Sequence, residues 1–364
     1  MADKVNYGVI GCGMMGQEHL RNIALLPDAR VAAIFEPDPG MAAKSLAFAK
    51  DAVLCPSIDD LLARPELDCL LIASPNYCHA DQFQMIADRR PLPLLMEKPV
   101  FTDPEDEARV SELGENYPAP VWVAMEYRYM PPIAAFLKEL PSVTGGVTML
   151  TIREHRYPFL NKIGDWNRFN RYSGGTLVEK CCHFFDLMRL IMNSEPVRIM
   201  ASAGQDVNHL DELRNGERPD ILDGAFVIID FASGTRAMLE LCMYAEGSRY
   251  QEEITGLGKS GKVEVKVPGP TRFWPEGLGD PPVPKVLISP RNPPGPRVLS
   301  VPVDPDLLSI GDHNGSTFYQ HQRFIKVVRG SGAPEVSLGD GIAAVKMGMA
   351  AQKSAIAGQA VELG

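Results

Sequence analysis

Short apolar runs recur along the first third of the chain, separated by stretches long enough for a crossover helix. Near-continuous apolar runs are typical of parallel strands that are buried on both faces of a sheet. The runs cover residues 5–10, 30–35, 67–73, 92–96 and 121–124. Alternation of such strands with helices predicts a doubly wound parallel sheet.

After residue 124 the pattern changes to longer segments in which apolar and polar positions alternate. This period of two predicts strands with one buried and one open face, as in an antiparallel sheet. The segments cover residues 147–155, 197–207, 225–231, 236–243, 250–255 and 262–267. Helical patterns cover residues 176–192 and 342–357. We therefore predict two domains, residues 1–124 and residues 125–364.

A proline-rich segment interrupts the second domain between residues 268 and 305. Short apolar runs at 285–288 and 298–301 predict strands within it. The segment is therefore expected to be a rigid surface excursion rather than a disordered linker.

Composition narrows the class of partner. The chain has 364 residues, 45% hydrophobic and 23% charged, which suits two globular domains. Its formal net charge of −10 disfavours nucleic acid, because no excess of Lys and Arg neutralises phosphates. A small-molecule substrate is the expected partner.

The first residues pass directly into a predicted strand, which leaves no room for a signal peptide, and no apolar run approaches the length of a membrane span. The seven cysteines form no CxxC pair and no cluster with metal-ligand spacing. We expect buried free thiols, no metal and a cytoplasmic location.

A glycine turn follows the first strand, with Gly11, Gly13 and Gly16 in dinucleotide-binding spacing around Met14 and Met15. Gly11 would make the tight turn, Gly13 would let backbone amides approach a pyrophosphate, and Gly16 would allow close helix packing. This context predicts a Rossmann domain.

The second strand ends at Glu36. A carboxylate there accepts the ribose hydroxyls and repels a 2′-phosphate, so we expect NAD rather than NADP. Ligands of such sheets bind beyond the carboxyl ends of the strands. The crevice is therefore expected to include, besides the glycine turn, Ser74, Asn76, His79, Glu97 and Lys98.

Three motifs converge on one family. They are the glycine turn with His19, the tripeptide Glu97-Lys98-Pro99, and residues 174–186 around His183. Together they resemble the glucose-fructose oxidoreductase and inositol dehydrogenase (Gfo/Idh/MocA) family. The resemblance implies a C-terminal α/β domain with an open antiparallel sheet, and homo-oligomers that form through that sheet. It also implies an unusual backbone, such as a cis peptide, at Lys98-Pro99.

Lys98 is a candidate catalytic residue on its position alone. A lysine at the end of a parallel strand, held by a proline, lies where nicotinamide and substrate would meet. Its ammonium can stabilise the alkoxide that develops as hydride leaves a carbinol. A structural pair with Glu97 is the alternative.

On the predicted helix 176–192, Glu179, His183 and Asp186 recur at i, i+4 and i+7 and share one face. His183 matches the family's catalytic histidine and would be the general base. Glu179 stands where the family commonly has Asp, so a role in orienting His183 or relaying a proton is an expectation. Lys180 is either a second cation at the pocket or a solvated residue.

The stretch 151–172 is basic in an acidic protein and precedes the catalytic helix. It predicts a sugar site in which Trp166 stacks on a pyranose face and cations bind hydroxyls or an anionic substituent. The alternative is a solvated strand edge. The expected substrate-binding residues are Tyr127, Arg153, Arg156, Lys162, Trp166, Arg168, Lys180 and His183. Residues 312–316, with Tyr319 and His321, are a second candidate rim, and surface caps formed by these histidines are the alternative.

Three functions remain open on the sequence. The first is an NAD-dependent dehydrogenase acting on a sugar, glycoside or cyclitol, with an anionic substituent expected. The second is a redox glycosidase that oxidises a ring hydroxyl transiently, eliminates the aglycone, adds water and restores the hydride, a reaction suggested by similarity to NAD-dependent sulfoquinovosidases. The third is a nucleotide-sensing regulator without catalysis.

Overall fold

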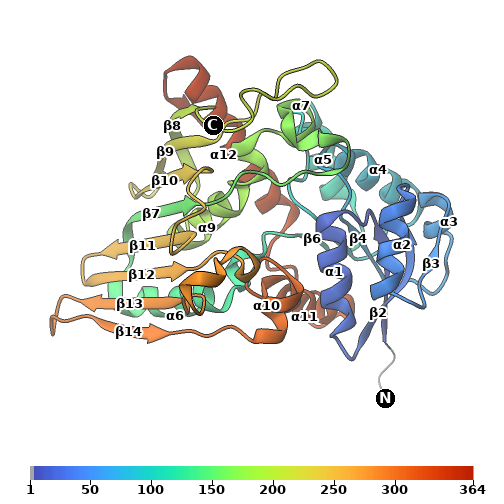
Figure 1. The fold of residues 1–364 in the computed structure, drawn as a ribbon, viewed down its shortest axis with the longest axis horizontal. Helices are drawn as coiled ribbons and strands as arrows, with labels where there is room; N and C mark the ends of the chain where they lie inside the picture. The colour runs from blue at the N-terminus through green and yellow to red at the C-terminus, as the bar shows by residue number, and fades with distance from the viewer. Residues whose placement is uncertain (1–3, 364) are drawn as a thin grey trace. The chain divides into compact units, whose positions relative to one another are not determined.

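The protein is described by a computed structural model over residues 4–363. Its backbone forms two compact units (Figure 1). Unit 1 contains the described residues up to Glu126 together with Lys162–Gly174 and Thr317–Val345, and unit 2 contains the rest. The boundary predicted between residues 124 and 125 falls close to the first crossing. The sequence pattern gives no sign of the two later returns to unit 1.

Unit 1 is built on a six-stranded sheet in which every neighbouring pair is parallel. The strand order is β3-β2-β1-β4-β5-β6, which reverses at β1, so the predicted doubly wound sheet is confirmed. The strands are β1 (Val5–Ile10), β2 (Ala29–Phe35), β3 (Val53–Leu54), β4 (Cys69–Ile72), β5 (Leu94–Met96) and β6 (Val121–Val123). Strands β4, β5 and β6 are buried throughout, as their apolar runs predict.

Helices cover the crossovers of this sheet, and local caps fix where two of them begin. Asp38 accepts the Met41 N–H at 2.8 Å at the start of α2, and Ser57 accepts the Asp60 N–H at 3.0 Å at the start of α3. The helices before the first crossing are α1 (Met14–Ala24), α2 (Pro39–Phe48), α3 (Ile58–Leu62), η1 (Asn76–Cys78), α4 (His79–Arg89) and α5 (Asp106–Asn116). The later segments of unit 1 contribute η3 (Ile163–Arg168), α7 (Asn170–Ser173), most of α11 (Ser316–Val328) and the start of α12 (Leu338–Ala357).

Unit 2 contains a nine-stranded sheet in the order β14-β13-β12-β11-β7-β10-β9-β8-β15. Its strands are β7 (Val147–His155), β8 (Pro196–Gly204), β9 (Gly224–Phe231), β10 (Arg236–Cys242), β11 (Glu252–Gly258), β12 (Gly261–Val267), β13 (Lys285–Pro290), β14 (Arg297–Ser300) and β15 (Val361–Glu362). All neighbouring pairs are antiparallel except β7 and β10, which run parallel. The predicted open sheet is confirmed, but it is mixed rather than purely antiparallel.

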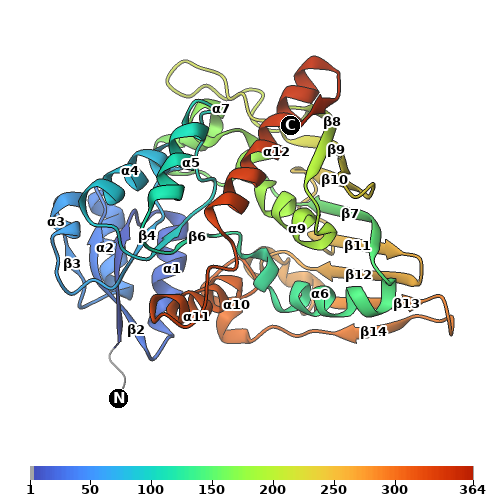
Figure 2. The same ribbon diagram turned by 180° about the vertical axis from the view of Figure 1, so that it is seen from behind.

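Helices pack on one face of this sheet and leave the other face open. Helix α6 (Pro131–Thr144) contacts β7, β11, β12 and β13, and α9 (Cys182–Met192) contacts β7. Figure 2, seen from behind, shows α6 in front of β12 and β13. The remaining helices of unit 2 are α8 (Thr176–Glu179), η4 (Thr271–Phe273), η5 (Glu276–Leu278) and α10 (Pro305–Ile310), while η2 (Glu126–Tyr129) begins at the first crossing.

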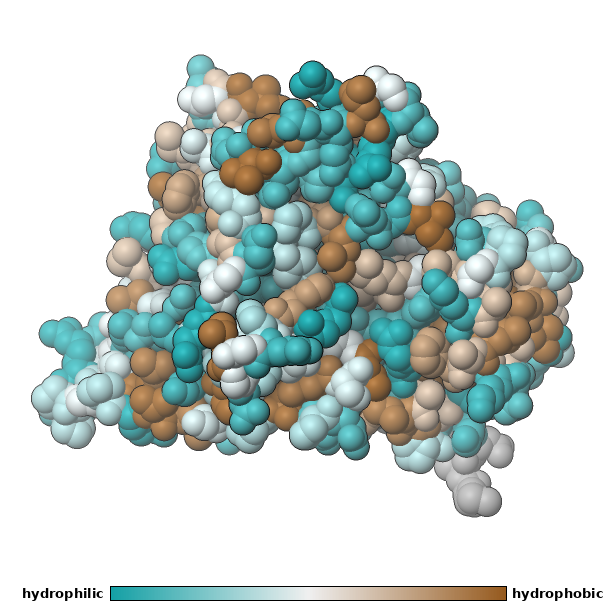
Figure 3. Space-filling view, viewed as in Figure 1, coloured by the Kyte–Doolittle hydropathy of each residue, from teal (hydrophilic) through white to brown (hydrophobic). Residues whose placement is uncertain are grey.

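The open face carries apolar side chains on neighbouring strands. Met200 on β8 pairs with Ile228 on β9, which pairs with Met238 on β10. Met200, Phe226 and Ile228 are 54%, 57% and 50% exposed. Apolar residues are also exposed on β14, where Figure 3 shows them at the left of the view.

Two further expectations meet the structure here. The predicted helix 176–192 is interrupted, because α8 ends at Glu179 and α9 begins at Cys182. All seven cysteines are free, five of them buried, as predicted. Within residues 4–363, none of the helices combines the length and apolar character that crossing a membrane requires.

Candidate functional site

The glycine turn has the geometry that its spacing predicts. Gly11 has φ +87°, and a Cβ there would lie 2.5 Å from the Ser74 backbone. A Cβ on Gly16 would lie 2.4 Å from the Gly11 carbonyl oxygen. Gly13, at the N-terminus of α1, has open space around its Cα and no side-chain cap. The free N-terminus of α1, beginning at Met14 and Met15, is therefore suited to a pyrophosphate.

Glu36 lies beside this turn, directly after β2. One carboxylate oxygen accepts the Cys12 N–H at 2.6 Å, and the other accepts the Asp38 N–H at 2.9 Å. These bonds fix the half-buried carboxylate next to the glycines. The residues present therefore fit an adenosine ribose whose hydroxyls donate to Glu36.

The residues after β4 hold neighbouring backbone segments. The Ser74 hydroxyl donates to the Gln82 side chain at 2.6 Å, and the Asn76 amide donates to the Ser173 carbonyl at 3.1 Å. The two ring nitrogens of buried His79 face the Pro99 carbonyl at 2.7 Å and the Ser74 carbonyl at 3.0 Å. These contacts favour a positioning role for His79 over direct contact with the cofactor that the sequence predicts.

Glu97 ends a buried chain of four side chains in unit 1. It lies 2.9 Å from His19, whose other ring nitrogen lies 2.9 Å from His321, and His321 lies 3.3 Å from the Tyr7 hydroxyl. Burial alone would raise the pKa of Glu97, but the hydrogen bond and charge of His19 lower it. Burial holds the pKa of His321 well below its usual range. The Glu97 carboxylate is thus held ionised beside Lys98.

Lys98 follows β5 and is half-buried. The Lys98-Pro99 peptide is cis, as the family resemblance implies. The Lys98 N–H donates to the Glu97 carboxylate at 3.2 Å, and His79 holds the next carbonyl. Lys98 therefore lies in a tightly specified turn at the carboxyl end of the sheet, next to the strand end that precedes Ser74.

In unit 2 the predicted base His183 is buried in the first turn of α9. Its ring stacks on Tyr127 with 4.2 Å between centroids and 9° between planes. The Tyr127 hydroxyl in turn accepts a hydrogen bond from Lys180. This arrangement fixes the plane of the imidazole and gives buried Lys180 a partner, so Lys180 is not the solvated residue of the alternative reading.

Two buried carboxylates that were not among the predicted site residues, Glu154 and Glu252, lie next to Lys180. The Lys180 ammonium lies 2.8 Å from Glu154, and Gln251 donates to Glu252 at 2.6 Å. Burial and the Glu154 carboxylate raise the pKa of Glu252 to about 7, and burial lowers the pKa of Lys180. The available signal was parity, since Glu154 shares the inward face of β7 with Leu150 and Ile152.

The break between α8 and α9 changes the expected polar helix face. Glu179 is the last residue of α8 and His183 lies in α9, so one continuous helix does not set their spacing. Both are buried. Asp186 forms a buried ion pair with Arg128, with the guanidinium Nε at 3.2 Å, so it has a structural partner.

The basic stretch does not form one cluster. Arg153 points to the open face of β7, where it pairs with Glu240 at 3.0 Å, whereas Lys180 pairs with Glu154 on the opposite face. Arg156 lies 3.8 Å from Glu154. Arg153 and Lys180 therefore lie on opposite faces of the sheet.

The remaining predicted substrate residues belong to unit 1. Lys162 lies 4.2 Å from the Trp166 ring centroid, and Trp166 meets Tyr77 edge to face. Arg168 is almost fully buried there. One correction concerns the second candidate rim, because His321 is fully buried against His19 and cannot form a rim.

The parallel sheet, its glycine turn and Glu36 define a class of protein, the Rossmann-type nucleotide-binding oxidoreductases. Family models then match two stretches of the chain. Residues 5–125 match the Gfo/Idh/MocA oxidoreductase family's NAD-binding Rossmann fold, and residues 142–363 match its C-terminal alpha/beta domain. The chain belongs to this family, and the predicted NAD-binding Rossmann domain is confirmed.

The chain is similar to named relatives in sequence and to solved structures in fold. The chain is 29% identical to inositol 2-dehydrogenase 2 of Saccharopolyspora erythraea, over 77% of this chain and 78% of the relative. It is 28% identical to inositol 2-dehydrogenase of Rhizobium meliloti, over 72% and 76%. The fold matches a myo-inositol dehydrogenase from Corynebacterium glutamicum with TM-score 0.77 and 20% identity, covering 99% of each chain. It also matches the Lactobacillus casei enzyme in complex with NAD(H) and myo-inositol, with TM-score 0.75, 20% identity and coverage of 99% and 97%.

Proposed function

We propose that the protein oxidises a ring carbinol of an uncharged cyclitol or sugar and transfers the hydride to NAD. The observation that carries the proposal is His183, buried and held by the stacked Tyr127 ring within a family of oxidoreductases. Similarity to inositol 2-dehydrogenases supports a cyclitol or a closely related polyol. NAD, when bound, supplies the hydride acceptor.

Each side chain has a separate task in this proposal. Glu36 binds the ribose and disfavours NADP, because its carboxylate repels a 2′-phosphate. The Lys98 ammonium donates to the substrate oxygen and stabilises the developing alkoxide. His183 accepts the hydroxyl proton, and Glu179 orients the imidazole or passes that proton on.

The ion pairs of the expected cations disfavour an anionic substituent on the substrate. Two of the cations expected to bind such a substituent, Arg153 and Lys180, already pair with carboxylates. A third, Arg156, lies near Glu154. An anion would have to displace these internal partners, which costs part of the free energy that it gains.

The first test replaces His183 and Lys98 singly by Ala. Loss of general base or alkoxide stabilisation should lower kcat/KM for myo-inositol oxidation by about 10²- to 10⁴-fold, measured as NADH formation, while NAD titration still shows binding. His209→Asn is the control, because its ring pairs with Glu212 and Asn tolerates its φ of +63°. Losses below about tenfold in both alanine variants would place the chemistry elsewhere.

The same assay separates the remaining readings. Release of aglycone from a glycoside, including a sulfoquinovoside, without net formation of NADH would show that the protein is a redox glycosidase rather than a dehydrogenase. NAD binding without turnover of any carbinol would favour the regulator.

The seven free thiols support a reducing, cytoplasmic compartment.

A further inference from the structure

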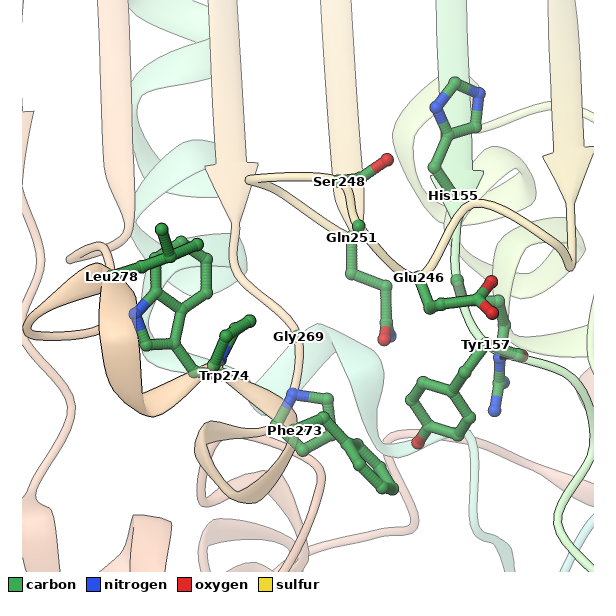
Figure 4. Close-up of a pocket in the computed structure, with 13 residues that line it drawn as sticks. His155, Tyr157, Glu246, Ser248, Gln251, Gly269, Phe273, Trp274 and Leu278 are labelled. Carbon is green, nitrogen blue, oxygen red and sulfur yellow. Dashed lines mark hydrogen bonds between the residues drawn. The ribbon is translucent and has the colours of Figure 1, made fainter.

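A cavity of about 130 Å³ lies within unit 2, and none of the residues proposed for hydride transfer lines it. It is bounded by the end of β7, by the turn between β10 and β11, and by residues 269–278 of the proline-rich segment (Figure 4). Neither His183 nor Glu179 lines it. The cavity therefore gives the proline-rich segment a role that the sequence pattern alone does not assign.

Aromatic rings form the walls of this cavity. Figure 4 shows Trp274 and Leu278 on one side, Tyr157 on the other and Phe273 below. Tyr157 and Phe273 are in contact with 4.4 Å between ring centroids. The Trp274 N–H donates to the Gly279 carbonyl at 2.9 Å, so its indole offers the cavity a ring face rather than a donor. Such walls suit a ligand with flat C–H faces.

The polar groups of the lining include the Glu246 carboxylate, the Gln251 amide and the Arg156 guanidinium. Glu246 contributes an exposed carboxylate, and Gln251 contributes a side-chain amide whose nitrogen donates to Glu252 at 2.6 Å. Arg156 is engaged internally, because its Nε–H donates to the Tyr157 carbonyl and its guanidinium lies 4.5 Å from the Tyr157 ring centroid. The lining thus pairs one carboxylate with one guanidinium and offers both acceptors and donors, which suits an uncharged ring that carries hydroxyl groups.

A series of side-chain contacts connects the floor of the cavity to the predicted base His183. Gln251 lies 3.5 Å from Glu154, Glu154 pairs with Lys180, and Lys180 donates to Tyr127, which stacks on His183. All these side chains belong to unit 2. A ring held in the cavity is therefore held at a fixed place relative to His183.

We propose that this cavity binds the second, uncharged sugar ring of a two-ring substrate, whose other ring carries the carbinol that is oxidised. Its volume suits one six-membered ring, since an engineered cavity of about 150 Å³ holds benzene. The aromatic walls contact the faces of the sugar ring, and Glu246 and Gln251 accept hydrogen bonds from its hydroxyls. This inference rests on the proposed function, which it narrows from polyols in general to uncharged glycosides.

The test compares one-ring and two-ring substrates with the NAD-loaded enzyme. The probes are myo-inositol with galactosyl-myo-inositol, and glucose with maltose and cellobiose. At least one two-ring probe should have a lower KM than its one-ring counterpart. Trp274→Ala should raise that KM about tenfold, with kcat nearly unchanged and the one-ring KM unaffected. Phe48→Ala, which removes an exposed aromatic ring from unit 1, is the control and should change neither.

A second variant tests the charge of the cavity. Glu246→Lys should weaken binding of the uncharged two-ring probe and strengthen binding of its uronate analogue, because the repelling carboxylate becomes a cation. Glu246 is exposed, so folding should be unaffected. Preference for the uronate by the wild-type enzyme, or no change in either affinity, would overturn the proposal.

Binding to the His183→Ala protein by calorimetry separates this proposal from the function on which it rests. Trp274-dependent binding of a two-ring probe without NADH formation from any carbinol by the wild-type enzyme would sustain the cavity and reject the dehydrogenase. Normal oxidation of one-ring substrates with no gain from a second ring would reject the cavity alone. Equal weakening of one-ring and two-ring probes in Trp274→Ala would also reject it.

Discussion

At the scale of single residues, the buried charges of unit 2 are the feature with the clearest energetic consequence. Glu154, Glu252 and Lys180 are each no more than 5% exposed. A buried ion pair is a weak source of stability, but loss of one partner leaves an uncompensated charge. The raised pKa of Glu252 means that the folded protein favours the neutral form of this carboxyl over the ionised form.

Replacing Glu252 by Gln should remove a pH dependence of stability. The pKa of Glu252 rises on folding from its ordinary value near 4.5 to about 7, so its neutral form stabilises the fold below pH 4.5 and that contribution is lost as pH rises to about 7. The amide introduced by the substitution stays neutral and keeps an acceptor for Gln251. Urea unfolding at pH 5 to 8 should therefore show a growing advantage of Glu252→Gln, up to about 3 kcal/mol at pH 8. A difference that is constant across this range would show that Glu252 does not titrate near neutrality.

Some residues of the candidate site could be predicted from the sequence, and others could not. The glycine turn, Glu36 and Lys98 follow from local patterns, because strand ends and tight turns leave a record over a few positions. The partners of Lys180 do not, since Glu154 and Gln251 come from other strands that the chain brings together only on folding. The separation of Arg153 from Lys180 likewise depends on which face of β7 each side chain meets.

At the scale of elements, strand bounds were predicted better than helix bounds. The segment 147–155 coincides with β7, because alternation has a sharp start and end. The stretch 176–192 has helical spacing throughout, yet the structure interrupts it at Lys180 and Cys181. The side chain of Lys180 is drawn into the buried charge cluster there, a tertiary interaction that periodicity does not encode.

The contact between α12 and α8 supplies a prediction about element packing. A Cβ on Gly348 would lie 2.5 Å from the Leu177 carbonyl oxygen, so Gly348→Ala should push α12 away from α8 and lower the free energy of unfolding by about 1 to 3 kcal/mol. The measurement is urea unfolding.

Gly339→Ala is the matched control in the same helix. The nearest atom to its added Cβ would be 3.6 Å away, so the substitution should be neutral or stabilise by up to about 1 kcal/mol through lower backbone entropy. Similar losses in both variants would show that the approach of Gly348 to α8 does not decide the result.

At the scale of the whole molecule, the open face of the sheet in unit 2 exposes apolar side chains to solvent in a single chain. Met200, Phe226 and Ile228 expose apolar side chains on adjacent strands. Clustered exposed apolar residues mark interaction surfaces. The family resemblance implies that copies of the chain associate through this sheet, and a stable interface needs about 800 Å² from each partner.

Ile228→Lys should therefore weaken self-association. A charged ammonium at the centre of a dry interface is costly, so sedimentation velocity should show a shift toward the monomer with the fold intact. Leu25→Lys is the control, because Leu25 is 45% exposed and lies in unit 1, outside this sheet. A wild-type protein that sediments as a monomer would rule out this interface.

Unit 1 is assembled from segments that are far apart in the sequence, which has a consequence for folding during synthesis. Phe324, in α11, packs near Tyr7 and Trp122 with 6.1 and 6.3 Å between ring centroids, and His321 closes the buried chain that begins at Tyr7. The parallel sheet is thus translated first, yet its last core side chains emerge from the ribosome almost 200 residues after Glu126. A nascent chain must protect apolar strand faces through that interval, and a fragment that stops at Glu126 lacks the helix that completes its own core. Shuffling this nucleotide-binding module between genes therefore requires that α11 travel with it.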